Sequence, residues 1–128
     1  MKKLLLCFLP VTLVIAGCQE EEKPTDVRKP GVSLFQPHDS VDTFASGQAM
    51  VIQALVTDND RLKDVYVELS KADTIVLDYH VQPEVASYSI DTTYTFSTTA
   101  ETDYTLRITA EDFTTNTYEF SRTFHVMP

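Results

Sequence analysis

The sequence predicts an all-β domain, a sandwich of two sheets built from seven strands over residues 32–128. Short runs of alternating apolar and polar residues recur along the chain, separated by turn-forming residues at intervals of about eight to twelve positions. No stretch shows a helical period of useful length, and threonine, which favours strands, is used heavily after residue 90. Strands at this spacing are typical of a β-sandwich, and a meander barrel is the alternative.

The first four strands are predicted in the segments 32–36, 48–57, 64–70 and 74–79. One face of the second strand is apolar, because its side chains alternate at Met50, Ile52, Ala54 and Val56. Between the first two strands lies a turn-rich stretch that ends at Gly47, and the tetrapeptide DNDR makes the next turn.

The last three strands are predicted in the segments 88–96, 102–111 and 116–127. The middle one is the clearest of all, with Tyr104, Leu106, Ile108 and Ala110 on one face. Arg122 falls on the inward face of the final strand. Because an unpaired buried charge is costly, this arginine predicts a bulge or an edge there.

Residues 1–17 have the features of an export signal. Lys2 and Lys3 precede an apolar segment, 4–16, that is shorter than the roughly twenty residues of a bilayer span. The tetrapeptide Ile-Ala-Gly-Cys at residues 15–18 resembles the lipobox of bacterial lipoproteins. The resemblance implies cleavage before Cys18 and acylation of its thiol, whereas an ordinary signal peptide with a chance cysteine is the alternative.

Lipidation accounts for the single cysteine of the expected mature chain, because Cys7 lies in the removed segment. Each buried CH₂ group of an acyl chain contributes about 0.8 kcal/mol, and one chain alone anchors a protein only marginally. Two or three chains on Cys18 would attach the protein durably to a membrane without a transmembrane helix.

Residues 18–31 are expected to comprise the lipidated cysteine and a polar, proline-containing linker. Glu20, Glu21 and Glu22 resemble the acidic export signal of surface lipoproteins in Bacteroidetes-type bacteria. The resemblance implies an outer-membrane lipoprotein exposed at the cell surface. A periplasm-facing lipoprotein, with the glutamates as a solvated linker, is the alternative.

Two segments of the domain resemble strands of bacterial immunoglobulin-like domains. SGQAMVIQALVTDND, residues 46–60, is similar to their B strand, and TDYTLRITAEDFTTNT, residues 102–117, to their F strand and the turn after it. The resemblance implies a seven-stranded immunoglobulin-like sandwich, with Tyr104 as a buried corner tyrosine whose hydroxyl binds the backbone. With the lipobox, the chain resembles the small Bacteroidetes-type surface lipoproteins of unknown function.

Acidic and amide side chains gather in two loops that an immunoglobulin-like sandwich places at one end. Asp58 and Asp60 follow the predicted B strand, and Asp112 and Asn116 follow the F strand. Ca²⁺ takes about six to eight oxygen ligands, so these four residues are a candidate calcium site. The alternative is turn chemistry, since Asp and Asn also stabilise turns.

Tyr66 is the tyrosine most expected to be exposed, and an exposed ring can stack on a saccharide, although half-buried strand tyrosines are common. Ser40, Thr74 and Thr92 each follow an aspartate, in DSV, DTI and DTT. These tripeptides resemble an O-glycosylation motif of Bacteroidetes-type exported proteins, and about one match is expected by chance.

The sequence favours a non-catalytic role. It contains no G-x-S-x-G elbow or comparable catalytic frame, and no cofactor is expected other than the candidate Ca²⁺. The net charge of −9 argues against a nucleic-acid partner. The expected function is binding or structural support at the cell envelope, with the membrane as partner through the lipid and a glycan or an envelope protein as ligand. The alternatives are a glycan-binding accessory lipoprotein of a nutrient-uptake system and a Ca²⁺-stabilised adhesion module.

Overall fold

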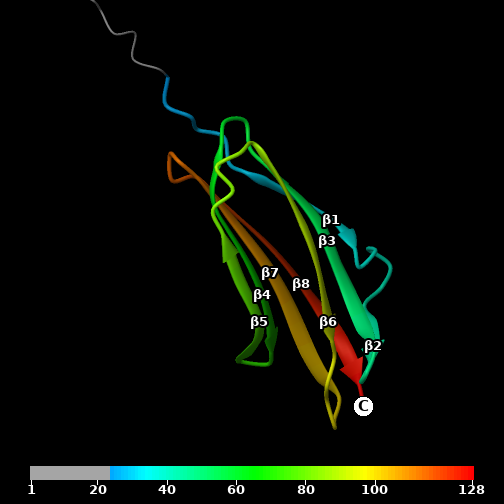
Figure 1. Ribbon diagram of the computed structural model, residues 1–128. Coiled ribbons are helices and arrows are strands. Elements are labelled where there is room, and N and C mark those ends of the chain that lie inside the picture. The colour runs from blue at the N-terminus through cyan, green and yellow to red at the C-terminus, as the bar shows by residue number, and fades with distance from the viewer. Residues whose placement is uncertain (1–23) are drawn as a thin grey trace, which may run out of the picture.

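Eight strands in two sheets form the domain in the computed structural model, which describes residues 24–128 (Figure 1). The strands are β1 (Gly31–Gln36), β2 (Thr43–Ala45), β3 (Ala49–Thr57), β4 (Leu62–Lys71), β5 (Thr74–Val81), β6 (Ser87–Thr95), β7 (Thr102–Asp112) and β8 (Thr117–Met127). No helix occurs among the described residues, so the predicted all-β class is confirmed.

The two sheets have three and five strands. Their orders are β1-β3-β6 and β2-β8-β7-β4-β5. All neighbouring strands are antiparallel except β2 and β8, which are parallel. The sheets lie as two layers, with the linker entering at one end and the C-terminus at the opposite end (Figure 1). The arrangement is therefore sandwich-like.

The core lies between the layers and is built by alternation along the strands. The faces predicted for β3 and β7 are the buried ones, namely Met50, Ile52, Ala54 and Val56, and Tyr104, Leu106, Ile108 and Ala110. Burial of apolar surface, at about 25 cal/mol per Å², is the main stabilising term for such a core. Alternation correctly identified which side of these two strands faces the core.

The number of strands differs from the predicted seven, because the turn-rich segment contains β2. Its three residues pair with residues 125–127 of β8. Phe44 in this strand is buried, and its ring centroid lies 4.8 Å from that of Phe96 and 5.6 Å from that of Phe124. Pairing and ring packing, which both depend on the tertiary fold, therefore create a strand where the local sequence indicates turns.

The burial and the backbone hydrogen bond expected for Tyr104 are confirmed. Its side chain is fully buried, and its hydroxyl donates a hydrogen bond of 2.9 Å to the carbonyl oxygen of Ser97. The ring also meets the ring of Phe96 edge-on at a centroid distance of 4.9 Å. Tyr104 thus fixes the connection between β6 and β7 to the start of β7.

Candidate functional site

Four segments that are distant in sequence meet where the linker joins the domain (Figure 1). We call this region the linker end; it comprises residues 24–30, the β3–β4 loop at 58–61, the β5–β6 loop at 82–86 and the β7–β8 loop at 113–116. Carboxylate oxygens of Asp26, Asp58 and Asp112 lie within 4.8 Å of one another there. We call these three residues the carboxylate triad.

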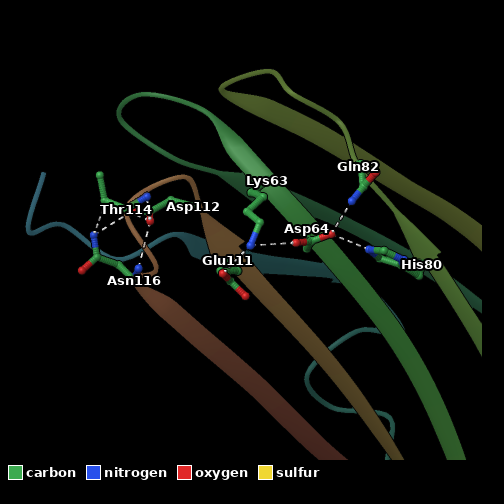
Figure 2. A network of polar contacts seen from close by, with 8 residues as sticks. All are labelled: Lys63, Asp64, His80, Gln82, Glu111, Asp112, Thr114 and Asn116. Carbon is green, nitrogen blue, oxygen red and sulfur yellow. Dashed lines mark hydrogen bonds and ion pairs between the residues drawn. The ribbon is translucent and has the colours of Figure 1, made fainter.

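Asp112 is the buried member of the triad, with 1% of its surface exposed. One carboxylate oxygen accepts hydrogen bonds from the backbone N–H groups of Thr114 and Asn116 and from the Thr114 hydroxyl, at 2.7, 2.9 and 2.9 Å. The Asn116 side-chain amide donates to the other oxygen at 2.7 Å (Figure 2). Burial alone raises the pKa of Asp112, but these bonds outweigh it and lower the pKa, so the group is ionised near neutral pH.

Asp58 carries the unsatisfied atom of the triad. Its Oδ2 accepts a hydrogen bond of 3.0 Å from the backbone N–H of Asp60, as in an Asx turn. Its Oδ1 is buried and has no hydrogen-bond partner among the described residues. A buried acceptor without a donor is costly, so this oxygen is the atom at which a bound cation would be most stabilising.

Asp26 joins the linker to the two loops. Its carboxylate accepts hydrogen bonds from the Asn59 side-chain amide at 2.8 Å and from the backbone N–H of Arg28 at 2.9 Å. Its carbonyl oxygen accepts a hydrogen bond from the Asn116 amide at 3.0 Å and lies 3.3 Å from the Thr114 hydroxyl oxygen. The part of the linker that the structure describes is therefore held against the domain.

The structure brings together two of the four predicted calcium ligands. Asp58 and Asp112 belong to the triad, whereas the carboxylate of Asp60 does not, and Asn116 presents its amide nitrogen to Asp112 and Asp26. Asp26 was not predicted as a ligand. It lies in the linker, far in sequence from the other two carboxylates, and no local pattern distinguishes it from a solvated linker residue.

The geometry of the triad suits an oxygen-binding cation. Two oxygens that bind one Ca²⁺ at roughly 2.3–2.6 Å can lie up to about 5 Å apart, and the triad oxygens meet this limit. Each of the three carboxylates offers one oxygen within this distance, and backbone carbonyls or water complete such a shell in proteins. Without a cation, three neighbouring carboxylates repel one another.

A second polar cluster lies on the outer face of the five-stranded sheet, around the buried carboxylate of Asp64 (Figure 2). His80 Nε2 lies 2.6 Å from Asp64 Oδ1, and the Gln82 amide donates to the same oxygen at 3.1 Å. Lys63 Nζ lies 3.6 Å from Asp64 and 2.9 Å from Glu111. Burial raises the pKa of Asp64, but His80, Gln82 and Lys63 together outweigh it and lower the pKa.

Tyr66, the predicted saccharide stacker, is 41% exposed on the same outer face. Its ring is stacked on that of His80, with a centroid distance of 4.2 Å and an interplanar angle of 6°. One face of the tyrosine ring is thus covered by the protein itself. Any sugar contact would use the remaining surface of this stacked pair.

The predicted O-glycosylation residues differ in accessibility. Ser40 lies exposed in the connection before β2, and Thr74 lies exposed at the start of β5. Thr92 is only partly exposed and pairs in β6 with Ile52, whose side chain is buried in the core. Ser40 and Thr74 therefore have room for a glycan, whereas Thr92 has less.

Cys18, the predicted lipid-attachment residue, and the signal segment 1–17 lie outside the described residues. Within residues 24–128, no helix is long and apolar enough to cross a membrane.

No protein-family model matches the chain, and a search of curated proteins found no significant match.

Proposed function

We propose that the protein is a lipid-anchored, non-catalytic, immunoglobulin-like module of a bacterial cell envelope, similar to small Bacteroidetes-type surface lipoproteins. The observation that carries the anchoring is the lipobox-like Ile-Ala-Gly-Cys at residues 15–18 after a short apolar segment. Binding or structural support is the role proposed for the domain, with a glycan or an envelope protein as its ligand.

The strand order supports the immunoglobulin-like assignment. In such domains the A, B and E strands share one sheet and the C, F and G strands share the other. The order β1-β3-β6 corresponds to A-B-E, and β8-β7-β4 corresponds to G-F-C. The two segments that resemble B and F strands coincide with β3 and β7.

Replacement of the lipidated cysteine tests the anchor. With Cys18→Ala we expect the protein to leave the membrane fraction and the precursor to remain uncleaved by the lipoprotein peptidase. Fractionation and mass spectrometry of the N-terminus measure both effects. Cys7→Ala is the matched control, because Cys7 lies in the segment that is removed. The lipid anchor would be ruled out if Cys18→Ala stayed in the membrane fraction and were processed like the wild type.

A second candidate function is that of a Ca²⁺-stabilised adhesion module. The observation that favours it is the carboxylate triad, in which Asp58 Oδ1 is buried without a hydrogen-bond partner among the described residues. A cation there would neutralise the triad and fasten the linker, through Asp26, to both loops.

Thermal unfolding tests the cation. A ligand at about 100 times its Kd stabilises the folded state by about 2.7 kcal/mol. For a domain of this size that raises Tm by roughly 10 °C or more. We expect such a rise with CaCl₂ relative to chelator in the wild type, and its loss in Asp58→Asn and Asp26→Asn.

Asp78→Asn, at an exposed position of β5 outside the triad, is the matched control and should keep the response to calcium. An identical wild-type Tm in calcium and in chelator would exclude this second function, while leaving the lipid anchor untouched.

A further inference from the structure

Exposed apolar side chains gather at the linker end, from three of its segments. Val27 is 81% exposed in the linker, Val85 is 49% exposed in the β5–β6 loop and Phe113 is 43% exposed in the β7–β8 loop. The guanidinium of Arg61 lies over the Phe113 ring, 4.5 Å from its centroid. An aromatic ring beside a cation is a pairing suited to the boundary between lipid headgroups and acyl chains.

The exposed charges of this end differ in sign from those of the opposite end. Arg28, Lys29 and Arg61 are exposed at the linker end, against two exposed acids, Asp60 and Glu84. The triad carboxylates are buried or partly buried.

At the other end of the sandwich Asp73, Glu101 and Asp103 are exposed, whereas Lys71 there is partly buried. Of the two ends, the linker end is thus the one that offers exposed cations to the phosphates of a lipid surface.

The chain itself directs this end toward the membrane. Five residues separate Cys18 from Pro24, and at roughly 3.1 Å per residue they reach no more than about 20 Å. Asp26 then holds the linker against the β3–β4 and β7–β8 loops. A short tether of this kind creates a high effective concentration, so even a weak contact with lipid would be occupied most of the time.

We propose that the linker end rests on the lipid headgroups of the leaflet that holds the anchor, through Val27, Val85 and Phe113 with Arg28, Lys29 and Arg61. The sandwich then stands upright, with its opposite, acidic end directed away from the membrane. This inference rests on the proposed lipid anchor for the tether, and on the exposed side chains of the linker end for the contact.

The chain has no tryptophan, so single substitutions create unique fluorescent probes. Phe113→Trp reports on the linker end. Ile75→Trp is the matched control, because Ile75 is a similarly exposed apolar residue beside the β4–β5 turn at the opposite end. The lipidated protein is reconstituted in vesicles of phosphatidylethanolamine and phosphatidylglycerol that contain a spin-labelled lipid as quencher. We expect quenching several-fold stronger for Phe113→Trp than for Ile75→Trp.

A second preparation separates the contact from the natural anchor. The chain from Cys18 onward is coupled through its thiol to maleimide-bearing lipids in the same vesicles. If the natural protein does not associate with membranes, the lipid anchor is refuted. Strong quenching of Phe113→Trp in the coupled protein would still support the contact. Equal quenching of the two probes in the coupled protein would overturn the contact. A concentration-dependent blue shift of the Phe113→Trp emission without vesicles would also overturn it, in favour of a second copy.

Discussion

Arg122 shows how a cation is tolerated on the inward side of a strand. Its Nη1 donates a hydrogen bond to the carbonyl oxygen of Pro37. Its Nη2 lies within 3.3 Å of four further acceptors, the carbonyl oxygens of His38, Asp39 and Val41 and the carboxylate of Asp42. The pairing of β7 with β8 continues past it without a bulge, and β2 pairs only with residues 125–127 of β8. Arg122 therefore lies where β8 is an edge strand, which is one of the two predicted alternatives. The loop that Arg122 holds in place satisfies its charge.

Asp64 is the residue whose ionisation should contribute to stability. Its pKa is lowered from 3.8 in the folded state, despite burial, by His80, Gln82 and Lys63. The contribution of this group is therefore complete above about pH 4 and is lost as the pH falls through the folded-state value. In urea unfolding at pH 7, we expect Asp64→Asn to be less stable than the wild type by about 1–3 kcal/mol. The difference should shrink in acid, below the unfolded pKa.

The control for this measurement is Asp78→Asn, which removes an exposed carboxylate from the neighbouring strand. It should change stability by less than about 0.5 kcal/mol at either pH. If the free energies of unfolding of Asp64→Asn and the wild type differed equally at pH 3 and pH 7, the site would act by packing alone.

At the scale of the element, β7 is the central strand of the five-stranded sheet, paired with β4 on one side and β8 on the other. Leu106 on its inner face is fully buried. Leu106→Ala leaves a cavity, and we expect the free energy of unfolding to fall by about 2–5 kcal/mol in urea denaturation.

Arg107→Ala is the matched control on the outer face of the same strand. The Arg107 side chain is 45% exposed and forms ion pairs with Glu68 and Glu119 across the sheet. Exposed pairs contribute at most about 1 kcal/mol, so this change should be small. If both variants had the same small effect, the assignment of the two faces of β7 would be wrong.

β2 marks the limit of what local sequence can predict about an element. Alternation needs at least four or so residues to be recognisable, and β2 has three. Its strand structure comes from backbone pairing with β8 and from the burial of Phe44 against rings of β8 and the segment after β6. These partners are more than fifty residues away in the sequence, so no local window contains them.

At the scale of the whole molecule, the acidic run at Glu20, Glu21 and Glu22 predicts display at the cell surface. Protease added to intact cells should then release peptides of the domain, detectable by mass spectrometry. Replacement of all three glutamates by alanine should protect the domain, because the protein would stay on the periplasmic side. Glu101→Ala, which removes one exposed carboxylate at the far end, is the control and should leave cleavage unchanged. If the wild-type domain resists protease in intact cells and is cleaved only after the outer membrane is opened, the periplasm-facing alternative is favoured.

The sequence by itself determined the all-β class, the inward faces of β3 and β7, and the positions of Asp58 and Asp112 near the ends of those two strands. These properties are local, because side-chain alternation and turn chemistry depend on neighbouring residues.

Only the tertiary structure decided that Asp26 of the linker completes a carboxylate triad, and that His80 covers one face of Tyr66. It alone also decided that Arg122 holds residues 37–42. Each of these depends on the register and packing of segments distant in the chain, which no local pattern encodes.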